Sequence, residues 1–364
     1  AIMTNNTDSL SVSGNHLLYF SGKDSLLSFG NAEFRKWSTE DTTLQINSDS
    51  LSLEEGFFFA WQNVRLRSSN ALGTCGQAVY MREDDVAIMR DHPVLQEEDF
   101  ILTGDIFNLH MQVGELSSVY VPENPYFRQF KTAEDSTYTD WLDGKVMAVE
   151  FYQGQPETVT LIDMATSFFN VLEEGKFKGS NKVSGDTLFI LLTESNISDI
   201  TVTGGAEGEF KPAKGSADIN TSIKYWAHKI SYNMEKETTL LQKSAIIEYG
   251  DMTLQSGQIG VYWPQNLLRA RSMIDTVGAV DFPVLKQTGQ DDFHGKSMVY
   301  DLKTQRGKVT AGRTKMDEGN YYGDELTRIN EDTYLMEDGY YTTCSIEDHP
   351  HFYFRSKQMK LLTD

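Results

Sequence analysis

Apolar and polar residues alternate along much of this chain. The pattern runs through residues 43–47, 64–67, 107–113 and 146–151. Successive side chains of a β-strand point to opposite faces, so each segment predicts a strand with one apolar and one polar face. Turn dipeptides such as Glu55-Gly56 and Asp338-Gly339 recur roughly every 10 to 14 residues, a spacing typical of short antiparallel strands. The sequence therefore predicts an all-β protein.

Residues 226–248 contain neither Gly nor Pro, so a helix could form there. However, Ile230, Tyr232 and Met234 are spaced by two, which is the period of a strand. The pair Gly250-Asp251 that follows is a good hairpin turn. We therefore expect two strands in this segment.

A weak repeat starts at Gly104, Gly144 and Gly185, with spacings of 40 and 41 residues. Each copy is predicted to consist of a strand, a turn and a second strand. Regular spacing of this kind favours a sheet that is stacked or rolled along one axis.

The alternation also selects the residues that we expect to face the interior of the sheet. A register slip of one residue would move any strand's set to the opposite face. The predicted interior set is Leu44, Ile46, Val64, Leu66, Phe107, Leu109, Met111, Met147, Val149, Phe151, Leu188, Ile190, Leu192, Ile246, Tyr300 and Leu302.

Composition narrows the possible partners. The chain has a net charge of -21, whereas binding to nucleic acid phosphates requires clustered Lys and Arg. The same charge argues against docking onto an anionic membrane surface. No apolar run reaches the length of about 18 residues that a membrane-spanning helix needs.

No catalytic motif was found. The chain contains no G-x-S-x-G, no H-E-x-x-H and no complete P-loop, so we expect no enzymatic activity, no cofactor and no metal. His349 and His351, beside Asp348, could form a metal pair, but no Cys or His nearby in sequence completes a shell, and a turn before a strand explains them better.

The C-terminal third carries a resemblance to a known family. Residues Asp338-Gly339-Tyr340-Tyr341-Thr342-Thr343-Cys344, followed by 348–354, resemble a signature of the LptD/OstA family of outer-membrane lipopolysaccharide-assembly proteins, also called organic solvent tolerance proteins. Segments 246–254 and 297–307 look like the strand-turn units of that family. The resemblance is clearest over residues 226–362 and extends in style to residues 42–210.

The resemblance implies a fold and a function. It implies an elongated antiparallel β-jelly roll, an open V-shaped curled sheet, as one roll or as several stacked units. Lipid A acyl chains would contact the predicted interior set and move toward an outer-membrane barrel that follows the chain. Implied partners are lipopolysaccharide, other OstA-like jelly-roll proteins of the periplasmic bridge and an outer-membrane lipoprotein. The implied location is the periplasmic face of the outer membrane.

The resemblance also bears on the domains and the cysteines. We expect N-terminal strands over residues 1–41, jelly-roll units over 42–225 and a C-terminal jelly roll over 226–364. In the family, the cysteine at the place of Cys344 pairs with cysteines of the barrel, so Cys344 is a disulfide candidate. Family members often carry another cysteine near the mature N-terminus. Cys75 lies much deeper in the chain, which puts the usual pairing in doubt.

Two other functions fit the same pattern. The chain could be a structural β-solenoid or sandwich that spaces or docks partners without binding lipid, since alternation also describes the packed core of any sandwich. It could also be an enzyme on a β-solenoid, such as a polysaccharide lyase. That would require a cleft with clustered carboxylates and basic residues, and the sequence marks none.

Overall fold

The computed structural model describes residues 1–7, 9–37, 42–68, 72–96, 100–112, 115–133, 135–153, 155–173, 175–194, 196–215, 219, 221–274, 278–316, 319–330, 333–346 and 349–362. Within these residues the protein is all-β and the strand pairings described are antiparallel, which confirms the predicted class. One 3-10 turn, η1 (Trp263–Gln265), is the exception. The part of the chain that the structure describes contains no helix that is long and apolar enough to cross a membrane.

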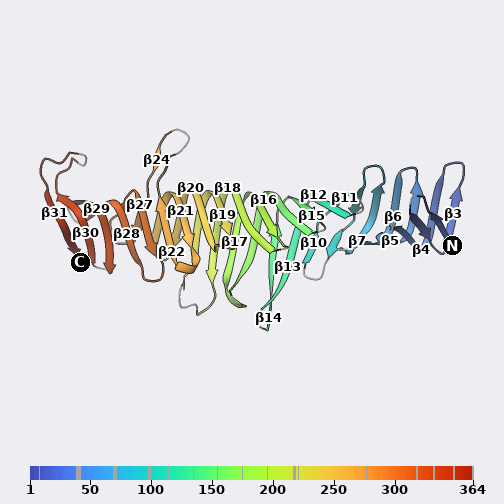
Figure 1. The fold of residues 1–364 in the computed structure, drawn as a ribbon, viewed down its shortest axis with the longest axis horizontal. Helices are drawn as coiled ribbons and strands as arrows, with labels where there is room; N and C mark the ends of the chain where they lie inside the picture. Colours follow the sequence, from blue (N-terminus) through green and yellow to red (C-terminus); the bar gives the residue numbers. More distant parts are fainter. Residues whose placement is uncertain are drawn as a thin grey trace. The chain divides into compact units, whose positions relative to one another are not determined.

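The chain divides into two compact units (Figure 1). Unit 1 comprises residues 1–169 and 187–197, and unit 2 comprises residues 170–186 and 198–364. The boundary falls within three long strands, β16 (Gln155–Glu173), β17 (Lys176–Thr193) and β18 (Asn196–Pro212). The predicted division at residues 41 and 225 stays a prediction.

The other strands of unit 1 pair antiparallel, some with the next strand of the chain and others with a strand further along, as β8 does with β11 and β12 with β15. They are β1 (Ile2–Asn5), β2 (Leu10–Ser13), β3 (His16–Phe20), β4 (Ser25–Trp37), β5 (Thr42–Glu54), β6 (Phe57–Ser68), β7 (Leu72–Met81), β8 (Val86–Arg90), β9 (Val94–Gln96), β10 (Phe100–Thr103), β11 (Ile106–Gln112), β12 (Glu115–Val121), β13 (Tyr126–Ala133), β14 (Ser136–Asp143) and β15 (Val146–Tyr152).

The strands of unit 2 follow the same antiparallel pattern, and the predicted pair within residues 226–248 is confirmed as β19 and β20. They are β19 (Ile223–Asn233), β20 (Thr238–Tyr249), β21 (Met252–Tyr262), β22 (Leu267–Arg271), β23 (Met273–Ile274), β24 (Val280–Asp281), β25 (Val284–Gln287), β26 (Phe293–His294), β27 (Ser297–Asp301), β28 (Arg306–Met316), β29 (Gly319–Asn330), β30 (Thr333–Thr342) and β31 (Phe354–Leu362).

Long strands are interrupted near their middle, and the interruption divides each into two halves. The pairing of β4 with β5 shifts between Phe29 and Ala32, and that of β20 with β21 shifts between Gln242 and Ala245. Left-handed residues fill these gaps, as a bulge requires. They are Gly30 and Asn31 in β4, Lys243 and Ser244 in β20, and also Gln62 and Asn63 in β6, whose pairing with β7 shifts between Trp61 and Val64.

The glycines that start the sequence repeat occupy equivalent places. A Cβ atom on Gly104 would lie 2.5 Å from Val121 Cγ1, and one on Gly185 would lie 2.7 Å from Val202 Cγ1. The corresponding distance from Gly144 to Leu161 Cδ2 is 3.2 Å. Each glycine thus lets its strand approach a side chain 17 positions further along the chain, so the repeat is a structural one.

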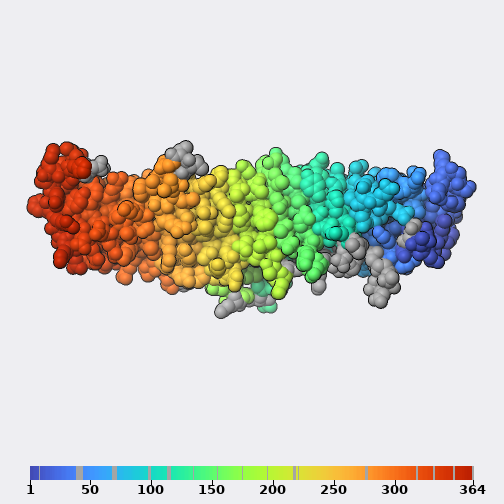
Figure 2. Space-filling model, turned by 45° about the horizontal axis from the view of Figure 1, so that its top comes forward, coloured from blue at the N-terminus to red at the C-terminus, as the bar shows by residue number. Residues whose placement is uncertain are grey.

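Within each unit, neighbouring strands pack closely. On the face shown in Figure 2 the side chains of each unit leave no wide opening. This agrees with the near-zero exposure of interior residues such as Phe58, Met147 and Leu241. In this structure the apolar face of each sheet is therefore filled by its own side chains.

Candidate lipid-binding interior

Unit 1 contains an unbroken row of apolar side chains that crosses consecutive strands. Each member is the cross-strand partner of the next, so the row follows from strand register alone. All members except the half-buried Leu53 are at most 8% exposed. The row consists of Leu26, Leu53, Phe58, Tyr80, Ala87, Leu109, Val119 and Val149.

A second row lies beyond the strand bends. It consists of Val12, Phe34, Ile46, Leu66, Gly73, Leu95, Leu102, Phe127 and Leu142. The ring centroids of Phe34 and Phe58 are 4.4 Å apart, although the two residues belong to different rows. The two halves of the bent sheet therefore bring their apolar faces together.

Unit 2 repeats this arrangement. Its main row is Val202, Ile230, Leu241, Ile259, Ala270, Met298, Val309, Leu326 and Met336. No member is more than 5% exposed. A facing row in the other half of the strands contains Tyr225, Ile247, Leu254, Leu285 and Phe293.

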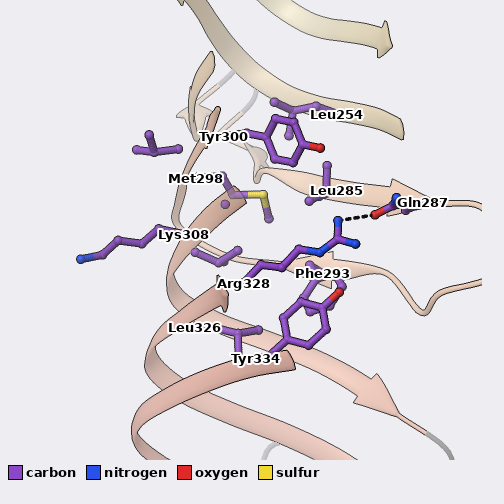
Figure 3. Close-up of a pocket in the computed structure, with 13 residues that line it drawn as sticks. Leu254, Leu285, Gln287, Phe293, Met298, Tyr300, Lys308, Leu326, Arg328 and Tyr334 are labelled. Carbon is purple, nitrogen blue, oxygen red and sulfur yellow. Dashed lines mark hydrogen bonds between the residues drawn. The ribbon is translucent and has the colours of Figure 1, made fainter. Parts of the chain in front are cut away.

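A small cavity lies between the two halves of unit 2 (Figure 3). Its volume is about 30 Å³, roughly the room that one water molecule needs. Its wall is mostly apolar, with Leu254, Leu285 and Phe293 from one half and Met298 and Leu326 from the other. Arg328, Gln287 and the hydroxyls of Tyr300 and Tyr334 add a polar side.

Arg328 is the unusual member of this wall, since it is only 8% exposed. Its Nη1 donates to Gln287 Oε1 at 2.8 Å and its Nε donates to the carbonyl of Asn330 at 3.3 Å. The guanidinium also lies over the Tyr334 ring, 6.0 Å from the centroid. Burial raises the pKa of Tyr300 to about 12, although the charge of Arg328 acts in the opposite direction.

A second polar cluster in unit 2 is neutral. Tyr225 and Tyr232 join through their hydroxyls. The Tyr225 hydroxyl donates to Asn181 Oδ1 at 2.5 Å, and Asn181 Nδ2 donates to the Tyr232 hydroxyl at 2.8 Å. Burial, above all, raises the pKa of both tyrosines, so the cluster remains uncharged at neutral pH.

The polar cluster of unit 1 contains opposite charges. Lys36 Nζ donates to the Tyr80 hydroxyl at 2.9 Å and lies 3.7 Å from Asp85 Oδ1. Tyr80 in turn donates to Asp85. The Lys36 ammonium thus lies beside the Asp85 carboxylate.

Most of the predicted interior residues are buried. Those at 8% exposure or less are Leu44, Ile46, Val64, Leu66, Phe107, Leu109, Met147, Val149, Leu188, Ile190, Tyr300 and Leu302. Register brings Ile46 beside Leu66, and it places Leu109 and Val149 on either side of Val119. Met111, Phe151 and Leu192 are half-buried. Whether any of these residues contacts lipid stays a prediction.

Ile246 lies on the opposite face from the interior rows. Its partners across the strands are Trp226 and Gln255, and it is half-buried. Its neighbour Ile247 is fully buried between Tyr225 and Leu254. Adjacent residues of a strand face opposite sides, so the interior position belongs to Ile247.

Sequence reasoning missed several interior residues. Met298 and Leu326 lie at alternating positions in β27 and β29, so the period of two would have found them. Arg328 lies two residues after Leu326 and therefore shares its face. The period of two thus marks position 328 as interior, but the prediction selected only apolar residues and therefore left Arg328 out.

Other candidate chemistry does not converge. Among the described residues, no group of three or more His, Cys, Asp and Glu could hold a metal ion. Asp348 lies outside those residues.

Cys75 and Cys344 are both free and buried, and burial raises the pKa of Cys75 to about 11. Cys344 Sγ lies 3.9 Å from His351 Nδ1.

Comparison with known proteins adds a structural similarity. No family profile matches the chain, and no curated protein matches it. Among solved structures, the chain is similar to LptH, the LptA-homologous periplasmic component of the conserved lipopolysaccharide transport device of Pseudomonas aeruginosa. The identity is 16%, the TM-score is 0.25, and the match covers 47% of this chain and 81% of LptH. A TM-score this low carries no argument, so the function is argued from this chain's own residues.

Proposed function

We propose that this chain is a non-catalytic periplasmic segment of a lipopolysaccharide-transport apparatus. The acyl chains of lipid A would lie along its apolar interior and pass toward a barrel in the outer membrane. The observation that carries the proposal is the register of the interior rows, since each crosses strand after strand with almost no polar side chain.

Elementary energetics supports a lipid ligand. Each CH₂ group removed from water contributes about 0.8 kcal/mol, so an apolar row binds acyl chains without specific chemistry. The resemblance of residues 338–354 to the LptD/OstA signature supports lipopolysaccharide as the lipid. It also supports a location at the periplasmic face of the outer membrane.

One end of the unit 1 row meets an open surface. A hollow with a volume of about 880 Å³ is bordered by Tyr19, Phe20, Phe57 and Phe59. Tyr19 is the cross-strand partner of Leu26, the first residue of the row. An acyl chain that rests on the exposed rings of Tyr19, Phe20 and Phe57 would already be close to the first residue of the row.

Partners of the proposed apparatus could add to the sheet at its edges. Strand β1 pairs only with β2, and β31 pairs only with β30, among the pairings described. Free backbone groups at such edges accept a further strand. Other OstA-like jelly-roll proteins are the proposed partners there, beside an outer-membrane lipoprotein.

A second candidate function is a structural spacer that binds no lipid. Close packing of the interior favours it, because residues such as Leu161 and Leu241 are fully buried and the described cavity in unit 2 holds about 30 Å³. For lipid to enter, the two halves of each bent sheet must separate.

Binding of purified lipopolysaccharide to the chain tests the proposal. Leu109→Asp places a charge in the interior row, whereas Asn108→Asp places the same charge on the opposite face of β11. We expect Leu109→Asp to weaken lipopolysaccharide binding at least tenfold while circular dichroism still shows a folded sheet. The Asn108 variant should bind like the unaltered chain. Absence of binding by the unaltered, folded chain would instead support the spacer.

A further inference from the structure

Three polar side chains connect the two halves of the bent sheet of unit 1. Lys36 lies on the interior face beyond the bend of β4, because its cross-strand partners Leu10 and Leu44 are buried. Tyr80 belongs to the first interior row, on the other side of the bends. Lys36 Nζ donates to the Tyr80 hydroxyl at 2.9 Å. This hydrogen bond therefore joins β4 in one half to β7 in the other.

Asp85 completes the connection from the turn after β7. Its Oδ1 lies 3.7 Å from Lys36 Nζ, and the carboxylate accepts a hydrogen bond from the Tyr80 hydroxyl. The ammonium also lies 5.4 Å from the centroid of the Tyr80 ring. Hydrogen bonds to charged groups are roughly twice as strong as neutral ones. The Tyr80 hydroxyl thus has a charged partner on each side, and we call Lys36, Tyr80 and Asp85 the unit 1 clasp.

The unit 1 clasp joins the interior positions that are furthest from the bends. Counted from the bend of β4, the interior positions are Ala32, Phe34 and Lys36. Counted from the bend of β7, they are Ala78 and Tyr80. The two halves of a bent sheet separate most at the positions furthest from the bend. The clasp therefore lies where unit 1 would open first, and the apolar side chains lie between it and the bends.

Solvent reaches the charged ends of the clasp but not its aromatic ring. The side chain of Lys36 is 34% exposed and that of Asp85 is 30% exposed, whereas Tyr80 is only 2% exposed. A partly exposed ion pair contributes little to stability, because water replaces its partners when it breaks. The clasp can therefore open while the strands of each half stay paired.

Unit 2 offers the matching comparison. The hydroxyls of Tyr225 and Tyr232, on opposite sides of the bend of β19, join in its interior. Both tyrosines are at most 8% exposed, so water does not reach this connection as it reaches the clasp. The unit 1 clasp, unlike the pair of tyrosines, can exchange its partners with solvent.

We propose that the unit 1 clasp closes the interior of unit 1 and opens to admit an acyl chain. This inference rests on the proposed lipid-binding interior and adds a gate to it. In the open state, water replaces the contacts that Lys36 and Asp85 make across the two halves. In the closed state, the same contacts keep the Tyr80 ring in the interior.

The association rate of a neutral acyl probe tests the gate. The methyl ester of cis-parinaric acid fluoresces in apolar surroundings and carries no charge, so Lys36 does not attract it. Tyr80→Phe removes only the hydroxyl, and Lys36→Met removes the ammonium but keeps an apolar stem. Each variant of the full chain should bind the ester about fivefold faster in stopped-flow mixing, the factor that one lost hydrogen bond represents. Affinity should stay equal or rise, because the apolar rows are unchanged.

Matched variants separate the gate from general effects of charge and size. Arg35→Met removes the neighbouring cation from the opposite face of β4, and Tyr120→Phe removes the hydroxyl of an exposed tyrosine. Both should keep the association rate of the unaltered chain. Asp85→Asn keeps an acceptor for Tyr80 but loses the charge, and should raise the rate about twofold. Because Asp85 is partly exposed, this variant gives a result even if Tyr80→Phe fails to fold.

Reaction of Cys75 with N-ethylmaleimide measures opening without any lipid. Cys75 is the cross-strand partner of the interior residue Val64 and is 8% exposed. The reagent reaches a thiol buried there when the two halves separate. Modification of Cys75, followed by mass spectrometry, should therefore accelerate about fivefold in Tyr80→Phe and Lys36→Met. Cys344 belongs to unit 2 and should react at the same rate in all these chains.

Failure of the gate and failure of the proposed function give different results. If the unaltered chain binds the ester and the folded variants match it in either rate, the clasp is not a gate and the lipid-binding interior stands. If Cys75 reacts faster in the variants but no chain binds the ester, the clasp closes an interior that admits no lipid, and the proposed function is wrong. Faster association with weaker binding would mean a loss of structure, and would overturn the gate.

Discussion

Units 1 and 2 have the same kind of apolar rows but differ in the polar groups that lie beside them. In unit 1, Lys36 lies 3.7 Å from Asp85, so the cation has a carboxylate of its own chain beside it. In unit 2, Arg328 donates to the neutral amide of Gln287. The comparison teaches that both units place a cation over a tyrosine ring, Lys36 over Tyr80 and Arg328 over Tyr334, beside different kinds of side-chain acceptor.

The largest expected effect comes from the contact between the two halves of unit 1. Phe58→Ala removes a fully buried ring that lies 4.4 Å from Phe34, centroid to centroid. We expect the free energy of unfolding to fall by about 3–5 kcal/mol. Hydrogen exchange should accelerate in the strands of unit 1 and stay unchanged in β27–β30. Equal acceleration in both units would show that they unfold as one.

The next effect concerns the register of unit 2. Ile247→Ala should lower the free energy of unfolding by about 2–5 kcal/mol, because it leaves a cavity between Tyr225 and Leu254. Ile246→Ala removes the same atoms from a half-buried position and should cost less than about 1 kcal/mol. Urea unfolding of both variants measures the difference. A larger loss for Ile246→Ala would reverse the assigned faces of β20.

The repeat glycines allow the same change in both units. In unit 1, Gly104→Ala forces a Cβ against Val121, and in unit 2, Gly185→Ala forces one against Val202 and the Thr203 carbonyl. Overpacking of this kind costs about 1–3 kcal/mol. Gly22→Ala is the control, because nothing lies within 4 Å of its new Cβ. Thermal unfolding measures the difference: Gly22→Ala should have the same midpoint as the unaltered chain, and the other two variants a lower one.

The smallest effect is a dependence on alkaline pH that belongs to unit 2. Tyr225 and Tyr232 have pKa values in the folded chain above the usual value of 10. Their contribution to stability is therefore complete below about pH 10 and declines above it, as the unfolded chain ionises first. For each tyrosine that stays neutral in the folded chain, the free energy of unfolding should fall by about 1.4 kcal/mol per pH unit in that range.

Absorbance of tyrosinate, followed together with unfolding, measures this dependence. Tyr232→Phe should reduce the slope of stability against pH by about one proton. An unchanged slope would mean that Tyr232 ionises equally in the folded and unfolded chain.

The sequence predicted the class of fold well, because alternation is a direct consequence of strand geometry. It identified both strands of residues 226–248 and the repeat glycines, whose close approach to Val121, Leu161 and Val202 only the structure shows. Alternation could not decide between the adjacent residues Ile246 and Ile247, since either could face inward. The partners across the strands decided between them.

The candidate site was less predictable for a physical reason. Alternation marks which residues share a face, but it does not show which half of a bent strand they occupy. The bends depend on left-handed residues such as Gln62 and Lys243, which have no strong preference for that conformation. The pairing of Phe34 with Phe58, and of Arg328 with Gln287, follows from those bends.

Photo-crosslinking to lipopolysaccharide tests the central claim most directly. In the test variants, a photo-activatable residue would replace Leu109 in the interior row of unit 1 or Met298 in that of unit 2. In the control variants, it would replace Asn108 or Val299, the neighbours of these residues on the opposite face. The account predicts lipid adducts at Leu109 and Met298 and none at Asn108 and Val299. Adducts at all four positions, or at none while the chain remains folded, would contradict a lipid-binding interior.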